Sequence, residues 1–205
     1  ESNYLHYQTY SQLLDKMVTS WRKRFNSEFP FYVVQIAPYQ YYSTDNAPAL
    51  LREQQELFTK HVKHTGLVTI SDLVNDIGDI HPIRKKEVGV RLANWALGDH
   101  YCLPVKGYKT PILDNIFFRK GKAIVRFRDL EKLKATSFKE LEIASWDGRF
   151  YDAEGCIKDN ELILWSEKVR APAYVRYCFN DDGEACLFNE TDLPVAPFRT
   201  DSFKK

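Results

Sequence analysis

The chain has 205 residues, of which 44% are hydrophobic and 28% are charged, the balance of a globular protein that builds its own core. Its 29 basic and 28 acidic side chains leave a net charge of +1, which excludes a global field that would attract nucleic acid or an anionic membrane. No apolar run approaches the roughly 20 residues of a membrane-spanning helix, so neither nucleic acid nor a membrane is an expected partner.

The first half of the chain alternates predicted helices with predicted strands. The predicted helices span residues 8–24, 49–64 and 84–97, and the predicted strands span residues 31–37 and 67–70. The strands are short, almost continuous apolar runs, which are typical of a parallel sheet buried on both faces. Gly66 and Gly98 are expected to end the second and third helices. This alternation predicts an α/β fold with helices packed on a parallel sheet.

From about Lys106 onward, helical periodicity gives way to short runs rich in branched and aromatic residues. The predicted strands here span residues 112–118, 123–127, 138–144, 161–166 and 173–178. Turn-forming pairs such as Lys120-Gly121 and Asp147-Gly148 separate them, which predicts a small antiparallel β domain of the sandwich kind. We therefore expect two domains, residues 1–105 and residues 106–205.

Aromatic side chains make up 14% of the chain. Large rings are common core residues in β-rich folds, which is the simpler interpretation. A flat ring also matches the apolar face of a pyranose, so an exposed aromatic side chain is a candidate platform for a sugar. The sequence leaves both interpretations open.

The four cysteines are too few for a disulfide-built scaffold, and no CxxC pair suggests zinc. Cys178 and Cys186 flank the turn-forming segment DDG and could face each other across a hairpin. A disulfide and two buried free thiols are both consistent with this spacing. No metal and no cofactor are expected.

The candidate catalytic residues follow the predicted strand at residues 67–70. Ligands of an open parallel sheet bind outside the carboxyl ends of its strands, and the loop there carries the sequence DIHP, with Asp79 and His81. His81 is a candidate general base, and Asp72, Asp76 or Asp79 could orient its imidazole. A solvated loop whose Asp and His cap the next helix is the alternative. No GxSxG elbow supplies a serine nucleophile.

Several long segments together resemble one family of enzymes. They are the chain start ESN, then FPFYVVQIAPYQY, ALLREQQ, GLVTISDLVNDIGDIHPIRKKEVGVRLANWAL and the C-terminal APAYVRYCFNDDGEACLFNETDLPVAPFRTD. These segments are similar to the sialate O-acetylesterases within the SGNH hydrolases, and the resemblance spans nearly all of the chain. It implies the C-terminal part of a flavodoxin-like, three-layer α/β sandwich followed by the β domain.

The resemblance also implies roles for individual residues. Asn3 matches the family's asparagine that donates a hydrogen bond to the oxyanion, and His81 matches the general base. The family's serine nucleophile lies in a Gly-Gln-Ser-Asn block, which this chain does not contain. SGNH enzymes usually place the orienting aspartate three residues before the histidine, where this chain has Gly78. Asp79 and Asp72 are the candidates for that role, and a Ser–His dyad is also consistent.

The function implied by the resemblance is a serine-type carbohydrate esterase that removes O-acetyl groups from sialic acid or a related acetylated glycan. Its expected partners are the O-acetylated sugar and the N-terminal half of the catalytic domain, because the chain starts at Glu1 without Met and an upstream segment is expected. The chain alone is expected to be inactive, and the location periplasmic or secreted. A non-catalytic glycan-binding or structural fragment and an acetylxylan-type esterase are the alternatives.

Overall fold

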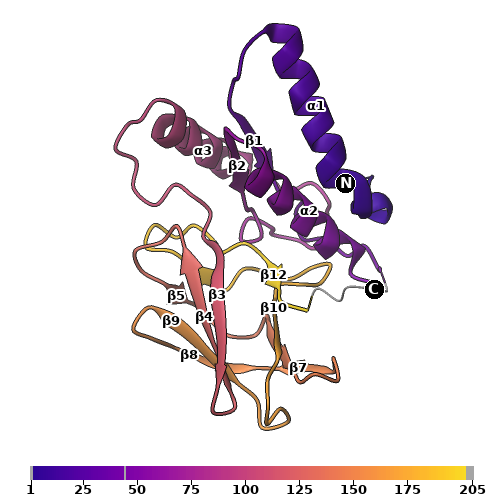
Figure 1. The fold of residues 1–205 in the computed structure, drawn as a ribbon, viewed down its shortest axis with the longest axis vertical. Coiled ribbons are helices and arrows are strands. Elements are labelled where there is room, and N and C mark those ends of the chain that lie inside the picture. The colour runs from indigo at the N-terminus through magenta and orange to yellow at the C-terminus, as the bar shows by residue number, and fades with distance from the viewer. Residues whose placement is uncertain (1, 44, 202–205) are drawn as a thin grey trace.

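The computed structural model describes residues 2–43 and 45–201, so the expectation at Glu1 lies outside the described residues. In the first half, strands β1 (Phe31–Val34) and β2 (Thr65–Val68) pair in parallel. A short 3-10 helix, η1 (Tyr4–Thr9), leads into helix α1 (Tyr10–Phe25), and helices α2 (Ala47–His61) and α3 (Lys85–Trp95) follow the two strands (Figure 1). The predicted α/β alternation is confirmed. None of the helices in the described part of the chain has both the length and the apolar character that crossing a membrane requires.

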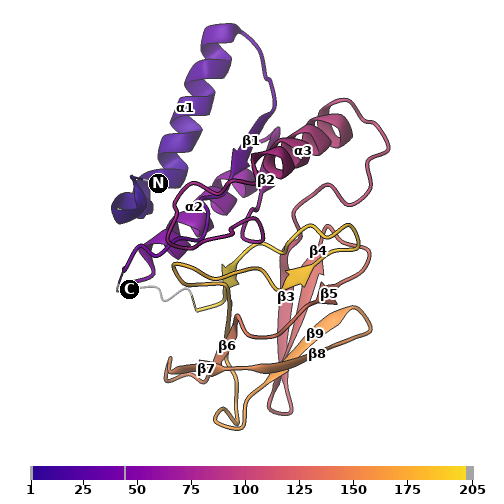
Figure 2. The same cartoon turned by 180° about the vertical axis from the view of Figure 1, so that it is seen from behind.

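Helices cover both faces of the β1–β2 pair. Val33 packs with Val18 of α1 and Phe58 of α2 on one face. Val34 packs in the cluster that contains Trp95 of α3 on the other face. Successive residues of a strand point to opposite sides, so an almost continuous apolar run supplies two buried faces. Figures 1 and 2 show the strand pair between α3 and the other two helices.

Two glycines lie inside elements instead of ending helices. Gly66 follows the end of α2 and lies within β2, where a Cβ atom would be 2.6 Å from the Trp95 ring. Gly98 lies inside a π-helical turn, η2 (Ala96–His100), that continues α3, and a Cβ atom there would be 2.4 Å from the Tyr108 ring. The prediction that these glycines end the helices was wrong. They are required for close packing beneath aromatic rings.

The second half consists of two four-stranded antiparallel sheets and a small strand pair. The sheet orders are β3-β4-β9-β8 and β12-β10-β6-β7, and β5 pairs with β11. The strands are β3 (Ile112–Arg119), β4 (Lys122–Arg128), β5 (Lys134–Ala135), β6 (Leu141–Ala144), β7 (Phe150–Asp152), β8 (Glu154–Lys158), β9 (Glu161–Trp165), β10 (Tyr174–Tyr177), β11 (Leu187–Phe188) and β12 (Phe198–Arg199). Val125 and Leu164 of one sheet pack with Ile143 and Val175 of the other. The predicted antiparallel β region is confirmed.

Five short strands, β5, β7, β8, β11 and β12, were not predicted, and residues 138–140 are not part of a strand. The missed strands have two to five residues each. A run of two residues has no recognisable period, and β8 contains Gly155, which weakens a strand pattern. β5 and β12 are defined by pairing with strands far away in sequence, β11 and β10, whereas β7 and β8 pair with the nearby β6 and β9.

The two buried cysteines are free thiols. The segment between them is not a hairpin, because β10 pairs with β6 and β12 whereas β11 pairs with β5. The buried Tyr177 hydroxyl accepts hydrogen bonds from the backbone N–H groups of Cys186 and Leu187, both at 3.0 Å. The prediction that Cys178 and Cys186 face each other across a hairpin was wrong, and the thiol alternative is the one in the structure.

The two halves of the chain pack directly on each other. The Arg199 guanidinium donates two hydrogen bonds of 2.9 Å to the Glu53 carboxylate on α2, and the Ala185 N–H donates to the Ser71 carbonyl at 3.3 Å. The division expected between residues 105 and 106 falls in the segment that connects η2 to β3. Because of this packing, loops of the β domain reach the carboxyl ends of β1 and β2.

Candidate functional site

The candidate site lies at the carboxyl ends of β1 and β2, where two loops leave the parallel pair. Residues 35–46 follow β1, and residues 69–84 follow β2. The Gln40 N–H donates to the Ile77 carbonyl at 3.0 Å and ties the two loops together. This edge is where open α/β sheets bind ligands.

His81 lies in the second of these loops with 80% of its side chain exposed. Its Nδ1 atom is 3.8 Å from an Asp79 carboxylate oxygen, which is longer than a hydrogen bond. The same oxygen accepts the backbone N–H of His81 at 2.8 Å, so Asp79 fixes the backbone beneath the imidazole. An exposed imidazole held on a fixed backbone can take a proton from a hydroxyl brought to it.

The other acidic side chains of this loop are engaged elsewhere. Both Asp72 carboxylate oxygens accept hydrogen bonds from the Arg91 guanidinium on α3, at 2.7 and 2.5 Å. This pair is largely buried, with 16% of Asp72 and 14% of Arg91 exposed. Asp76 accepts a backbone N–H within the loop at 2.8 Å. The Asp72 carboxylate is therefore paired with Arg91 of α3. Asp79 is the acidic residue that lies close to the His81 ring.

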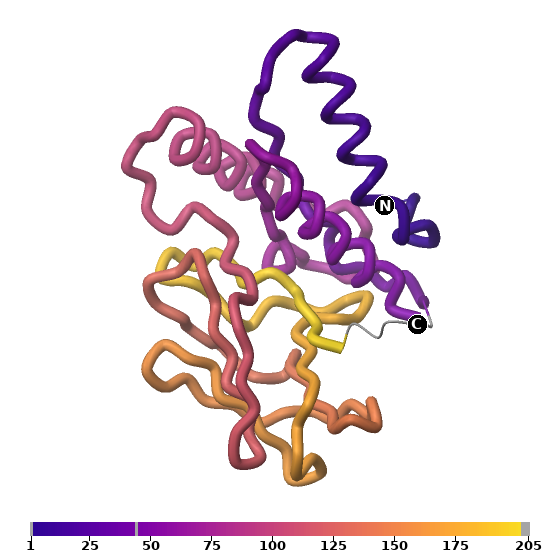
Figure 3. The backbone as a smooth tube through the Cα atoms, viewed as in Figure 1, coloured from indigo at the N-terminus to yellow at the C-terminus, as the bar shows by residue number. Residues whose placement is uncertain are grey.

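Asn3 lies exposed at the start of η1. The next side chain, Tyr4, packs against Tyr41 with 5.1 Å between ring centroids, and η1 packs against α2 (Figure 3). Tyr41 belongs to the loop after β1, which is bonded to the loop that carries His81. The N-terminal segment and the His81 loop therefore meet the same loop at the same end of the strand pair.

The β domain contributes Asp181 to the candidate site, a residue that sequence reasoning missed. The Asp181 carboxylate accepts the Ser43 backbone N–H at 2.8 Å and the Ser43 hydroxyl at 2.6 Å. Its carbonyl accepts the Tyr39 N–H at 3.2 Å. The sequence DDG indicated only a turn there, because the residues it contacts are 138 positions away.

A buried arginine anchors the same loop of the β domain to α2. The Arg52 guanidinium donates hydrogen bonds to the carbonyls of Asn180 and Asp181, and burial lowers its pKa. Arg52 is 2% exposed. Amphipathic spacing did not single it out, because a polar side chain on a helix is ordinarily assigned to the solvent face.

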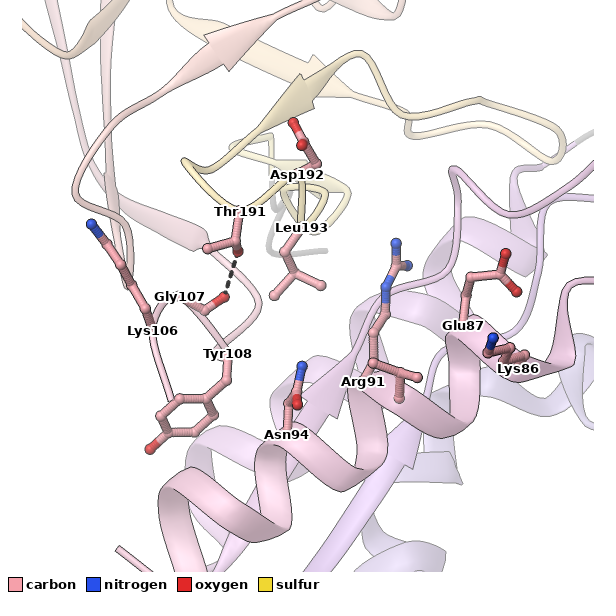
Figure 4. A pocket seen from close by; sticks show the side chains of 11 residues that line it. Lys86, Glu87, Arg91, Asn94, Lys106, Gly107, Tyr108, Thr191, Asp192 and Leu193 are labelled. Carbon is pink, nitrogen blue, oxygen red and sulfur yellow. Dashed lines mark hydrogen bonds between the residues drawn. The ribbon is translucent and has the colours of Figure 1, made fainter. Parts of the chain in front are cut away.

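A separate hollow of about 410 Å³ lies between α3 and the β domain (Figure 4). Arg91, Tyr108 and Thr191 contribute to its lining, and the Thr191 hydroxyl donates to the Gly107 carbonyl at 3.0 Å. Among the described residues, none of those predicted to be catalytic lines this hollow. Within the same described ranges, no three or more His, Cys, Asp and Glu side chains are grouped so as to hold a metal ion.

Comparison with solved structures shows a similarity to an enzyme. No known protein family matches the chain, and neither does any curated protein. Among solved structures, the chain is similar to a carbohydrate acetylesterase from Xanthomonas citri, with 32% sequence identity over 95% of this chain and a TM-score of 0.88. The match covers 46% of that enzyme, so this chain spans about half its length. The chain therefore has the fold of part of a carbohydrate esterase.

Proposed function

We propose that this chain is the C-terminal portion of a serine-type carbohydrate esterase that removes O-acetyl groups from sialic acid or a related acetylated glycan. The observation that carries the proposal is the exposed His81, on a loop at the carboxyl ends of β1 and β2, in a fold similar to a carbohydrate acetylesterase. The sialate assignment and the membership of the SGNH hydrolases rest on the sequence resemblance.

In the proposed reaction, neutral His81 removes the proton of a serine hydroxyl as that oxygen attacks the acetyl carbonyl. The Asn3 amide and backbone N–H groups donate hydrogen bonds to the resulting oxyanion. His81 then protonates the sugar oxygen as its bond to the acetyl carbon breaks, so that it leaves as a hydroxyl, and water hydrolyses the acetyl-enzyme. The chain requires no metal for these steps.

The aspartates have different roles in this proposal. Asp79 orients the imidazole, since its carboxylate is the acidic group beside the His81 ring at 3.8 Å. Asp72 holds the start of the loop on α3 through Arg91.

The nucleophile of the proposed enzyme belongs to an N-terminal half of the catalytic domain that adds strands to the β1–β2 pair. The β1–β2 sheet has two strands, whereas sheets usually have about four to six. This supports the addition of further strands beside β1 or β2. The completed domain would be the three-layer sandwich of the SGNH hydrolases, at work in the periplasm or outside the cell.

Acetyl release tests the proposal. We expect the protein that carries both halves to hydrolyse an aryl acetate and O-acetylated sialic acid, and the 205-residue chain alone to be inactive. His81→Ala should lower the rate at least about 100-fold, and Asn3→Ala about 100-fold or more. His61→Ala is the matched control, because His61 is an exposed histidine on α2. Activity of the chain alone, or an active His81→Ala protein, would overturn the assignment.

A non-catalytic glycan-binding fragment is the second candidate function. The observation in its favour is an exposed aromatic side chain on the β domain, Trp146, whose ring packs against the half-buried Tyr174. A complete protein that binds glycans but releases no acetate would establish this alternative.

A further inference from the structure

Trp146 is a large aromatic side chain on a well-defined turn of the β domain, and 78% of it is exposed. It lies in the turn that joins β6 to β7, where the Gly148 N–H donates to the Ser145 carbonyl at 3.1 Å. Gly148 has a φ of 72°, which glycine adopts without strain. The indole packs edge-on against the Tyr174 ring, with 5.4 Å between centroids and an interplanar angle of 80°. The turn and this contact fix the position of the exposed ring.

The residues around Trp146 lie on the outward face of the sheet that contains β6, β7 and β10. Tyr174 is opposite Ala144 in the register, and Ala144 is opposite Phe150. Trp146, in the turn, adjoins this face because its ring packs against the Tyr174 ring. The other face of the same strands carries core residues such as Ile143. β7 is an edge strand, so the turn lies at the margin of the domain (Figure 2).

The next row of the same face carries charged side chains. Arg176 is opposite Glu142, and Glu142 is opposite Asp152. The Arg176 guanidinium lies 3.8 Å from the Phe150 ring centroid and bonds to the Asp201 carboxylate. With Arg176 held by Asp201, the carboxylates of Glu142 and Asp152 are the acceptors that this row offers to a ligand. Burial raises the pKa of Glu142, and Asp152 raises it further.

We propose that this outward face binds pyranose units of a neutral polysaccharide. We call it the aromatic face and define it by Trp146, Tyr174, Phe150, Glu142 and Asp152. The exposed Trp146 ring offers a flat apolar surface to the C–H face of a sugar, Tyr174 and Phe150 support it from the sheet, and carboxylates accept hydrogen bonds from the sugar hydroxyl groups. The two carboxylates would repel a sialylated or uronic acid chain, so the ligand is uncharged.

Contacts along the sheet connect the aromatic face to the candidate site. The Phe179 ring lies 5.8 Å from the Arg176 guanidinium and 5.1 Å from that of Arg199. Arg199 is bonded to Glu53 on α2, and Phe179 precedes the loop in which Asp181 holds Ser43. These contacts pack the sheet that carries the aromatic face against the loop in which Asp181 holds Ser43.

Fluorine NMR of the chain labelled with 5-fluorotryptophan tests this proposal directly. The chain has four tryptophans, so four signals are expected, and the one absent from Trp146→Phe identifies residue 146. Titration uses the neutral hexasaccharides of cellulose, xylan and mannan, with sialyllactose as the anionic comparison. We expect at least one neutral hexasaccharide to shift the Trp146 signal in a saturable way and sialyllactose to leave it in place.

Variants show which side chains bind. Trp146→Ala should weaken binding of that hexasaccharide at least tenfold, measured by calorimetry, and Trp21→Ala should not change it. Trp21 is the matched control, since it is also exposed but lies on α1. Dispersion of the remaining fluorine signals shows whether each variant is folded. If Trp146→Ala is not folded, the more conservative Trp146→Phe takes its place and should weaken binding measurably.

Three results would overturn the proposal: no hexasaccharide moves the Trp146 signal, Trp21→Ala weakens binding as much as Trp146→Ala, or sialyllactose binds as tightly as the neutral sugars. None of these measurements depends on ester hydrolysis. Failure of the esterase reaction and failure of this binding site are therefore distinguishable.

Discussion

Asp72→Asn separates a structural role of Asp72 from a catalytic one. The substitution keeps the shape of the side chain and removes its charge, while the Arg91 guanidinium that donates to both carboxylate oxygens remains in place. Removing one partner of a fully buried ion pair costs about 3–5 kcal/mol. The side chains here keep some contact with water, 16% and 14% exposed, and Arg91 retains its hydrogen bond to the Thr69 carbonyl. We therefore expect a loss of about 2–3 kcal/mol.

Thermal and urea unfolding followed by circular dichroism measure this loss. A loss of this size lowers the Tm by roughly 5–10 °C in a chain of about 200 residues. A double-mutant cycle with Arg91→Met should give a coupling energy of at least about 1 kcal/mol. Glu131→Gln is the control, because Glu131 and Lys106 form an exposed ion pair, and exposed pairs contribute little to stability.

Acetyl release by the protein with both halves completes the test of Asp72. At a temperature well below the Tm, Asp72→Asn should retain most of the activity, while Asp79→Asn should lower it at least about tenfold. The reasoning is refuted if Asp72→Asn unfolds like the parent chain, or if a stably folded Asp72→Asn protein loses activity and Asp79→Asn does not. The second result would make Asp72 the group that orients His81.

Three further predictions concern the fold. Gly66→Ala should cost about 1–3 kcal/mol in urea unfolding, because a Cβ atom there would lie 2.6 Å from the Trp95 ring; an unchanged midpoint would mean that the ring moves freely. Burial raises the pKa of Glu56, so its ionised form opposes folding as the pH rises through that pKa. Glu56→Gln should therefore raise the Tm relative to the parent at pH 7 and not at pH 4, and the reverse order would contradict the argument. Burial also raises the pKa of Cys178 and of Cys186. A thiol reagent should therefore modify the exposed Cys102 and Cys156 first and this buried pair only in urea. A total of two reactive thiols in urea would instead indicate a disulfide between Cys178 and Cys186.

The elements of the first half were predictable because their signals are local. The apolar run before Gln35 and the periodicity of residues 8–24 set strand and helix within a few residues of their observed bounds. Gly66 and Gly98 were misassigned because glycine has two common roles: it ends helices, and it permits the close approach of a ring. Only the packed rings of Trp95 and Tyr108 show that the second role applies here.

The candidate site was predictable in part. His81 and its neighbour Asp79 follow a predicted strand, so the rule about carboxyl ends of parallel strands located them. The sequence left Asp72 as an equal candidate to orient the imidazole. Its pairing with Arg91, on the next helix, depends on how α3 packs against the loop.

The sequence by itself determined the alternating helices and strands of the first half, the change from an α/β to a β region, and the loop that carries His81. These follow from hydrophobic period and turn chemistry, which act over a few residues. Only the tertiary structure decided that Asp181 holds Ser43, that Arg52 is buried beneath the same loop, and that Trp146 remains exposed. Each of these depends on contacts between residues far apart in sequence or on burial, and a local pattern carries no information about either.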